Sequence, residues 1–378
     1  RALRLDPKSE AARFREAVLL SREKRFDEAA QSLCDLLQSG LTDREVHWKA
    51  GHQLAMVMDK MGDYSGAGQV WQASKQGMEV NYASEIKVAR EDFERKASLI
   101  RKLTDDLTPA RIQSWREAGS GLSRPRVLVG HPRSGTTLLE TILDRHSMLV
   151  SVEETTCMEN EVFRSVFGGA AAKPELFDAG FLDGVSAVSR RKAGSSYQKA
   201  TRQFIEGGVR NRVVLDKNPM LTHFLGVALR FFPELKSLVM IRDPRDVCLS
   251  CYQQPVGVVT SNVSWLRVED VMKSYQDIMG VWIRLREILP DGWLEVRYEE
   301  LVEDAHAESR RAVEFLELPW EEEALELRED ERTIFSPTYA DAIKPVYRTA
   351  VRRWENYGEL LDPHLPLLDK VVRELGYA

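Results

Sequence analysis

The most informative part of this chain is Val127-Leu-Val-Gly-His-Pro-Arg-Ser-Gly-Thr-Thr-Leu-Leu139. It has the pattern of a buried strand, a tight loop and the first turn of a helix, which together present backbone N–H groups to a phosphate. A Walker A loop would carry Lys-Ser/Thr after Gly135, but this chain has two threonines there, and Arg133 is the cation inside the loop. The stretch therefore predicts a phosphate site without the Lys and Mg²⁺ arrangement used for triphosphates.

Composition places the chain among ordinary globular proteins. With 378 residues it is long enough for two domains, and its net charge of −6 disfavours nucleic acid as a partner. No apolar run approaches the roughly 18–20 residues of a membrane span. Four cysteines are too few for a disulfide framework. Cys248 and Cys251 form a C-x-x-C without a second pair nearby, so we expect them to pack in the interior.

From residue 126 onward, short apolar runs alternate with helical stretches. This pattern predicts an α/β domain built on a P-loop-like, doubly wound parallel sheet. In such sheets, ligands bind beyond the carboxyl ends of the strands, where the polar motifs of this chain fall. The strands are predicted at 126–129, 212–215, 237–241 and 293–296.

The first 80 or so residues carry a weak internal repeat. Arg25-Phe-Asp-Glu-Ala29 and Asp63-Tyr-Ser-Gly-Ala67 begin 38 positions apart, and the same offset pairs other small and apolar residues. The pattern resembles tetratricopeptide repeats, which are about 34 residues long; a plain pair of helical hairpins is the alternative. The opening Arg1–Pro7 resembles the tail of a preceding repeat. We therefore expect either that the array begins before residue 1 or that the α/β region caps it.

A long charged helix is predicted over 82–103, and Thr108 followed by a proline predicts the start of a short one. A Gly/Ser-rich segment then leads into the α/β region. The expected organisation is an all-α, tetratricopeptide-like domain over 1–105, a linker over 106–125 and a catalytic domain over 126–378.

Two motifs make the α/β region resemble sulfotransferases that use 3′-phosphoadenylyl sulfate (PAPS), with the protein-tyrosine sulfotransferases and bacterial repeat-containing sulfotransferases as relatives. Pro132–Thr137 resembles the family's 5′-phosphosulfate loop, and Leu238–Ser250 its 3′-phosphate motif. The resemblance implies the sulfotransferase fold, PAPS as co-substrate, 3′-phosphoadenosine 5′-phosphate (PAP) as product, and no metal. The residues that it implies for binding the cofactor are Arg133, Ser134, Gly135, Thr136, Thr137, Arg242, Ser250, Tyr298, Lys344 and Arg353.

The resemblance also implies catalytic residues. Glu153-Glu-Thr155 matches a Glu-Glu-Thr of the tyrosine-directed enzymes whose second Glu is the base, so Glu154 is the expected base and Glu153 the alternative. His131 and His146 are weaker candidates. Lys217 matches a lysine that contacts the bridging or sulfuryl oxygens, and Arg133 is expected to act in the reaction as well as in binding.

The segment Phe335–Tyr347 contains Ile-Lys-Pro, which matches the family segment that closes over the cofactor and supplies Lys344. The family's catalytic serine falls on Thr338. This departure retains a hydroxyl, but Ser336 competes for the role.

The acceptor is poorly marked. Where tyrosine-directed enzymes have an arginine after Glu-Glu-Thr, this chain has Thr156, and Glu159 and Glu161 follow it. This local acidity disfavours an acidic peptide. Arg190-Arg-Lys192 is the candidate for an anionic acceptor, or a solvated helix. The acceptor hydroxyl can belong to a small molecule, a glycan, a lipid or a peptide tyrosine. The repeats can bind a protein partner or mediate self-association. The alternative functions are an inactive interaction scaffold and a P-loop nucleotide phosphotransferase. A bacterial origin would predict a cytoplasmic location.

Overall fold

The computed structural model describes residues 6–119, 125–164, 178–256, 262–322 and 350–377. Two compact units share the chain, and each contains segments that are far apart in sequence. Unit 1 comprises Arg1–Glu94, Cys248–Ser274 and Arg352–Asp369. Unit 2 comprises Arg95–Val247, Tyr275–Val351 and Lys370–Ala378. The units thus cut across the predicted linear order of repeat domain, linker and catalytic domain, and those boundaries stay a prediction.

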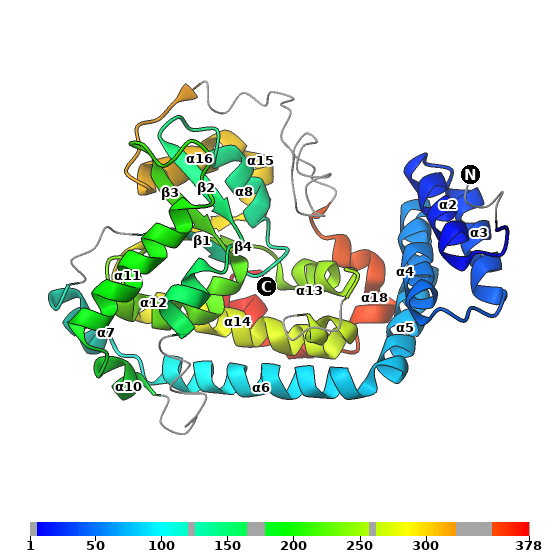
Figure 1. Cartoon of the computed structure of the whole chain (residues 1–378), viewed down its shortest axis with the longest axis horizontal. Coiled ribbons are helices and arrows are strands. Elements are labelled where there is room, and N and C mark those ends of the chain that lie inside the picture. Colours follow the sequence, from blue (N-terminus) through cyan, green and yellow to red (C-terminus); the bar gives the residue numbers. More distant parts are fainter. Residues whose placement is uncertain (1–5, 120–124, 165–177, 257–261, 323–349, 378) are drawn as a thin grey trace. The chain divides into compact units, whose positions relative to one another are not determined.

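Unit 2 contains a five-stranded parallel sheet with the strand order β2-β3-β1-β4-β5 (Figure 1). The doubly wound α/β prediction is confirmed. Four strands match those predicted, and β2, at one edge of the sheet, was missed. The strands are β1 (Arg126–Gly130), β2 (Leu149–Glu153), β3 (Val213–Lys217), β4 (Lys236–Ile241) and β5 (Trp293–Arg297).

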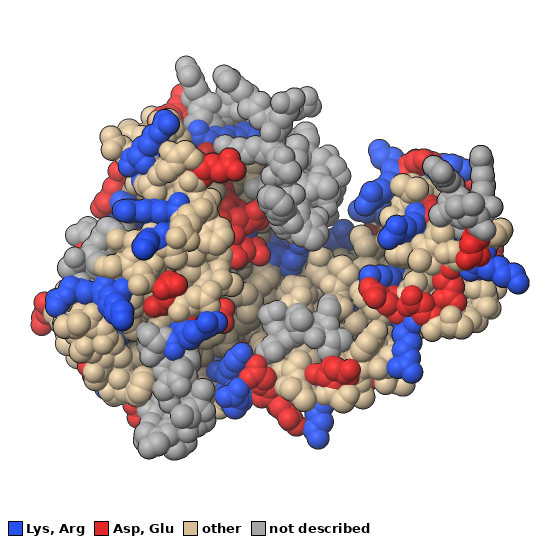
Figure 2. Space-filling view, in the orientation of Figure 1, with Lys and Arg blue, Asp and Glu red and all other residues tan. Residues whose placement is uncertain are grey.

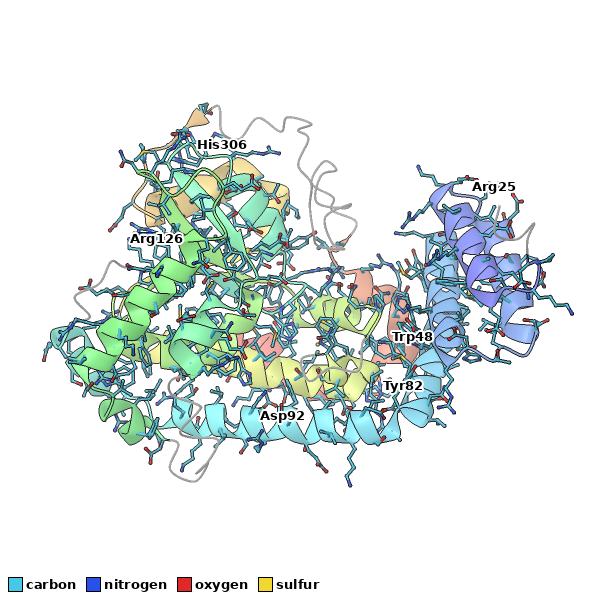
Figure 3. All side chains as sticks on the ribbon, in the orientation of Figure 1. Arg25, Trp48, Tyr82, Asp92, Arg126 and His306 are labelled. Atoms are coloured by element: carbon cyan, nitrogen blue, oxygen red, sulfur yellow. The ribbon has the colours of Figure 1, made fainter. Side chains whose placement is uncertain are left out.

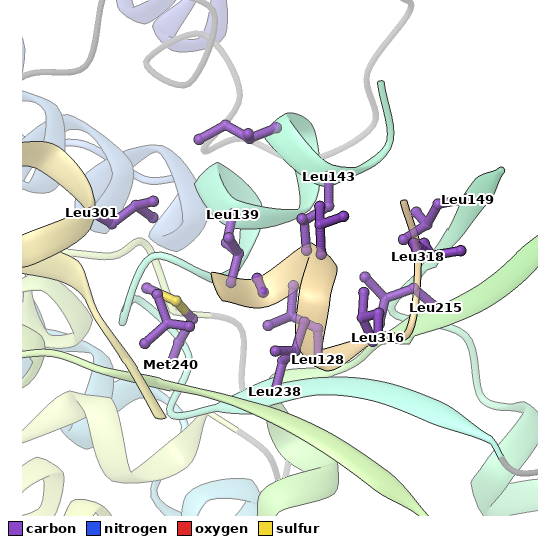
Figure 4. Packing of buried hydrophobic residues seen from close by; sticks show 14 residues of the cluster. Leu128, Leu139, Leu143, Leu149, Leu215, Leu238, Met240, Leu301, Leu316 and Leu318 are labelled. Carbon is purple, nitrogen blue, oxygen red and sulfur yellow. The ribbon is translucent and has the colours of Figure 1, made fainter. Parts of the chain in front are cut away.

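Helices cover both faces of this sheet (Figure 1). On one face, leucines of the strands pack against α8 and α16 in the main hydrophobic core (Figure 4). Helix α11 lies on the opposite face, where its Tyr197 reaches β3. The helices of unit 2 and those that continue into it are α6 (Ala83–Asp105), α7 (Pro109–Glu117), α8 (Thr136–Leu143), η1 (Glu159–Phe163), α10 (Ala179–Asp183), α11 (Ala187–Arg202), η3 (Pro219–Phe224), α12 (Leu225–Phe231), α13 (Pro244–Tyr252), α14 (Val268–Ile288), α15 (Tyr298–Glu303), α16 (Ala305–Phe315) and α19 (Asp369–Glu374).

Side chains on a strand alternate between the two faces of a sheet. The parallel register pairs Leu128 of β1 with Lys217 of β3, so Lys217 faces the α8 side, where Leu128 packs. Its neighbour Asp216 faces the α11 side. Two consecutive polar residues at the end of β3 therefore serve opposite faces of the sheet.

The N-terminal helices of unit 1 form two consecutive pairs, as the repeat pattern predicts. The small residues that match across the repeat, Ala17 with Ala55 and Ala29 with Ala67, are all fully buried, because close helix packing leaves no room for larger side chains. An aspartate is the N-cap of each of the next two helices. Asp43 accepts from two backbone N–H groups of α4, and Asp63 accepts from one of α5. Ancestry from tetratricopeptide repeats stays a prediction. The elements of unit 1 are α2 (Glu10–Arg22), α3 (Phe26–Gln38), α4 (Arg44–Met61), α5 (Tyr64–Asn81), η4 (Val263–Leu266), η7 (Arg353–Tyr357), α18 (Gly358–Leu361) and η8 (Leu365–Leu367).

A second hydrophobic cluster in unit 1 joins the N-terminal helices to the 248–274 segment. Met78 and Ile86 are buried together with Val263 of that segment. Trp48 and Tyr82 pack against the same cluster (Figure 3). The N-terminal helices have a cluster of their own around Leu33 and Leu54, and they share this one with the 248–274 segment.

Lys75 adds a polar link within unit 1. Its ammonium is buried and donates to the backbone carbonyl of Trp265 at 2.7 Å. It also lies over the ring of Tyr252, with Nζ 4.6 Å from the centroid. Burial lowers the pKa of Lys75 to about 7 because no carboxylate among the described residues contacts it.

Charged side chains of both signs are interspersed over the described part of the visible face (Figure 2). This distribution agrees with the modest net charge of −6 and differs from the basic stripe typical of nucleic-acid-binding proteins. None of the helices in the described ranges has the length and apolar character needed to cross a bilayer.

Candidate active site

The loop between β1 and α8 has the conformation of a ligand-binding turn. Gly135 has φ +103°, and a Cβ there would lie 2.5 Å from the ring of Tyr298, so only glycine fits. Arg133 also has a positive φ, of 72°, which is a strained conformation for a side-chain-bearing residue. The residues predicted to bind the 5′-phosphosulfate therefore lie on a loop shaped by neighbouring elements.

The base of this loop is fixed by Thr222 from η3. Its hydroxyl accepts from the Gly130 N–H at 2.8 Å and donates to the Gly130 carbonyl at 2.7 Å. Beyond it, Ser134 is buried, and its Oγ has no hydrogen-bond partner among the described residues. Thr136 and Thr137 begin α8, whose first backbone N–H groups have no acceptors within the helix. A hydroxyl and helix-start amides thus converge at one end of the loop.

Arg242, the predicted 3′-phosphate residue, follows β4 and reaches the same loop. It is 8% exposed and donates to the carbonyl of Arg133 at 3.0 Å and to that of Ala350 at 2.7 Å. Its guanidinium lies 4.7 Å from the centroid of the Tyr298 ring. The structure therefore brings together three residues that the sequence predicts for cofactor binding: Arg133, Arg242 and Tyr298.

The predicted catalytic lysine lies among carboxylates. Lys217 ends β3 with its side chain fully buried, and its Nζ is 3.0 Å from Glu153 Oε1 and 3.0 Å from Glu154 Oε1. A third carboxylate, Glu140 of α8, lies 3.4 Å away. The backbone N–H of Glu154 also donates to the Lys217 carbonyl at 2.7 Å. The ends of β2 and β3 thus hold the ammonium and the expected base together.

Charge and burial act against each other in this cluster. Burial alone lowers the pKa of Lys217, but the three carboxylates outweigh it and raise that pKa above its ordinary value. Glu140 is the reverse case, since burial raises its pKa to about 7 although Lys217 opposes the change. Lys217 is therefore fully charged at neutral pH, whereas Glu140 is near the midpoint of its titration.

Exposure separates the two candidate bases. The side chain of Glu154 is 55% exposed and that of Glu153 is 28% exposed. Glu154 therefore presents its carboxylate to solvent, where a hydroxyl can approach, while it still contacts Lys217. A solvent-facing carboxylate can take a proton from an approaching hydroxyl, and the neighbouring ammonium can stabilise negative charge on an oxygen bound beside it.

Two polar residues beside this cluster were not singled out in the sequence. Tyr197 of α11 donates to Asp216 Oδ2 at 2.7 Å, with both residues buried. The other oxygen, Oδ1, has no hydrogen-bond partner among the described residues. Burial raises the pKa of Asp216 to about 6. The pair fixes α11 to the strand that carries Lys217.

Replacing Asp216 with asparagine is expected to remove a pH dependence of stability. The folded pKa of about 6 lies above the model-compound value of 3.8, so this group stabilises the fold fully below pH 3.8 and loses its contribution as pH rises through 6. The difference corresponds to about 3 kcal/mol. Urea unfolding of both proteins should therefore give similar stabilities at pH 4 and a more stable Asp216→Asn at pH 7.5. Parallel curves at all pH values would contradict the expectation.

The two histidines considered as bases are engaged in packing. His131 is buried, its ring lies 4.8 Å from that of Tyr275, and burial lowers its pKa to about 4. His146 contacts the carbonyl of Pro319 at 2.7 Å. These environments favour Glu154 over either histidine as the base.

Other predicted site residues have different surroundings. Arg353 forms an ion pair with Asp59 in unit 1, and Tyr357 donates to the same carboxylate. The predicted role of Arg353 in binding the cofactor therefore stays a prediction. Ser250 lies within α13, and its pairing with Arg242 likewise stays a prediction. Thr338, Ser336 and Lys344 lie outside the described residues.

The three basic residues of α11 that are candidates for binding an anionic acceptor differ in exposure. Arg190 is buried and donates to the carbonyl of Gly119 at 3.0 Å, whereas Arg191 and Lys192 are exposed on the helix. Cys248 and Cys251 are buried, in agreement with packing. Within the described ranges, His, Cys, Asp and Glu side chains do not gather in groups of three or more that fit a metal ion.

A sequence model of the Sulfotransferase family matches residues 125–322, which is just over half of the chain and includes the loop, the Glu-Glu-Thr segment, Lys217 and Arg242. The chain therefore belongs to the Sulfotransferase family.

The chain is also similar to several individual proteins. An uncharacterized protein of Aquifex aeolicus is 26% identical over 360 residues, covering 93% of this chain, which spans 45% of that protein's length. Protein-tyrosine sulfotransferase 1 of Danio rerio is 27% identical over 272 residues, covering 67% of this chain and 72% of that protein. The sulfotransferase domain of the Synechococcus PCC 7002 olefin synthase is 18% identical and covers 67% of this chain and 96% of that domain, with a TM-score of 0.45.

Proposed function

We propose that this protein transfers the sulfuryl group of PAPS to an acceptor hydroxyl, with Glu154 as general base. The observation that carries the proposal is the contact of Glu154 with the buried Lys217 ammonium at 3.0 Å, at the carboxyl ends of β2 and β3. Membership of the Sulfotransferase family supports transfer of a sulfuryl group.

Each cluster residue has a defined part in this mechanism. PAPS supplies an activated sulfuryl group and a phosphate leaving group. Glu154 takes the acceptor's proton as the acceptor oxygen bonds to sulfur and the bond from sulfur to the phosphate oxygen breaks. Lys217 and Arg133 stabilise negative charge that develops on the sulfuryl and leaving oxygens. The products are the sulfate ester and PAP, and Glu154 returns the proton to solvent through its exposed side.

Buried polar atoms without partners support an anionic nucleotide as the ligand. Among the described residues, Ser134 Oγ and Arg242 Nε are both buried and have no hydrogen-bond partner, which is costly unless a ligand satisfies them. A hydroxyl at the start of a helix and a guanidinium are both suited to phosphate oxygens. The residues present therefore fit the phosphates of PAPS.

The acceptor is a hydroxyl compound, because Glu154 is suited to deprotonate an alcohol or phenol, and the Danio rerio relative is named for tyrosine. Arg191 and Lys192 stay candidates for an anionic acceptor. A cytoplasmic location and a protein partner for the helical repeats are further parts of the proposal.

Calorimetric titration with PAP and with adenosine 5′-phosphate, both without metal, tests the cofactor. We expect micromolar binding of PAP and a loss of about 1–3 kcal/mol when the 3′-phosphate is absent. Replacing Arg242 with glutamine should remove most of this difference. Arg202→Gln, which changes an exposed arginine of the same unit, is the control and should retain it.

Other outcomes would favour the alternative functions. Equal binding of the two nucleotides would contradict the 3′-phosphate prediction for Arg242. Absence of binding to either would favour the interaction scaffold. Turnover of a nucleoside triphosphate that depends on Mg²⁺ would favour a phosphotransferase.

A further inference from the structure

The carboxylates around Lys217 differ sharply in exposure. Glu140 is the innermost, with a side chain that is 3% exposed, and it reaches an ammonium that is itself fully buried. Glu153 and Glu154 contact the same ammonium from the more exposed side, at 28% and 55%. Three carboxylates around one ammonium exceed what is needed to neutralise it. Neutralising the ammonium therefore does not by itself account for the buried carboxylate of Glu140.

Two local rules place Glu140 there. It lies four residues after Thr136 in α8, and residues at that spacing share one helix face. Lys217 faces the α8 side of the sheet because side chains alternate along β3. The helix that begins at the phosphate loop is thus connected by an ion pair to the lysine at the end of β3.

The proposed proton transfer changes the charges around the lysine. When Glu154 accepts the acceptor's proton it becomes neutral, so its attraction for the ammonium weakens at the moment when negative charge develops on the sulfuryl oxygens. A buried ammonium that loses its counter-charges is strongly unfavourable. A partner that does not take part in proton transfer can hold the ammonium through this step.

We propose that Glu140 is a positioning residue, which holds the Lys217 ammonium from the buried side while Glu154 carries the acceptor's proton. The inference rests on the proposed function of this site. Glu140 does not touch the substrates; it acts through Lys217. The charged groups that act on Glu140 among the described residues are Lys217 of β3 and Glu153 of β2, and the Ser151 hydroxyl interacts with it as well.

The titration of Glu140 agrees with this role. Burial raises its pKa to about 7, Glu153 raises it further and Lys217 lowers it. The ammonium thus favours the ionised form of Glu140, which is the form that holds it, against the effect of burial.

Glu140→Gln tests the role in catalysis, since it keeps the shape of the side chain and removes its charge. We expect kcat to fall on the order of 10–100-fold, the Kd of PAP to stay within about 3-fold, and the ascending limb of the pH profile to change. Glu140→Asp, which restores the charge, should recover part of kcat. Glu308→Gln is the matched control, because Glu308 is also a buried carboxylate in an ion pair of unit 2, and it should keep the wild-type kcat.

A second measurement needs no cofactor. The ¹³C carboxyl resonance of Glu140, identified by its absence in Glu140→Gln, is titrated in the wild type and in Lys217→Met. Loss of the ammonium should raise the pKa of Glu140 by at least about 1. An unchanged titration, or a wild-type kcat and pH profile in Glu140→Gln, would overturn the proposal. Failure of the proposed function appears instead as a wild type that does not bind PAP, and the titration still decides whether Glu140 and Lys217 are coupled.

Discussion

Lys217→Met is expected to lower kcat by about 10²–10³-fold, the effect of removing one preorganised electrostatic group from an active site. Methionine keeps the stem of the side chain, so the change removes the ammonium and leaves the packing between the sheet and α8 largely intact. The loss should appear in kcat more than in the Kd of PAP, because the ammonium acts on charge that develops during transfer. Release of PAP from PAPS, in the presence of an acceptor found by screening alcohols and phenols, measures it.

Lys236→Met is the control for this change. Lys236 is a partly buried lysine of the same unit and forms an ion pair with Glu317 at 3.0 Å, but it lies at the beginning of β4, away from the carboxyl ends of the strands. It should keep kcat near the wild-type value. A folded Lys217→Met with wild-type kcat would show that the buried ammonium serves stability alone.

Glu154→Gln is expected to lower kcat by about 10²–10⁴-fold, the usual contribution of a general base, and to change the Kd of PAP by less than about 3-fold. Its side chain is 55% exposed, so the fold does not depend on burying it. Glutamine can still contact Lys217 through its amide oxygen but does not accept a proton. Calorimetry with PAP and the PAP-release assay together separate binding from catalysis.

Glu153→Gln distinguishes the two adjacent carboxylates, since both contact Lys217 at 3.0 Å. A base role for Glu154 predicts a much smaller loss of kcat in Glu153→Gln. The reverse order would transfer the role to Glu153, and loss of PAP binding in Glu154→Gln would remove Glu154 from the mechanism.

The loop and the strands beside it could be predicted because their signals are local. Gly135 and the apolar run before it specify a strand, a turn and a helix within 13 residues, and the structure has β1 and α8 there. Strand β2 was missed because its residues Leu149–Glu153 alternate only weakly between apolar and polar, and it is an edge strand with several half-buried positions. Its existence depends on pairing with β3, which the local sequence does not specify.

Part of the site depends on contacts that no motif encodes. In sequence, Glu140 is an acidic residue in a short helix, a position that is usually exposed, and its burial results from the packing of α8 against β3 and α16. Asp216 and Tyr197 are 19 residues apart and meet only because α11 returns to the sheet. Arg353 and Asp59 are 294 residues apart. A cofactor-binding motif covers only neighbouring residues, so it does not predict this ion pair.

The composition of unit 1 limits how this protein can be cut or recombined. Cys248–Ser274 and Arg352–Asp369 belong to the same compact body as the first 94 residues, and Val256, Val263 and Leu266 are buried against Met78 and Ile86. A fragment that starts at residue 126 would expose this apolar surface to water and should aggregate. In the same way, a gene fusion that exchanged only the N-terminal helices with those of a relative would join halves of an interior that did not evolve together. The natural unit of inheritance, and of expression in the laboratory, is therefore the helices together with the α/β region.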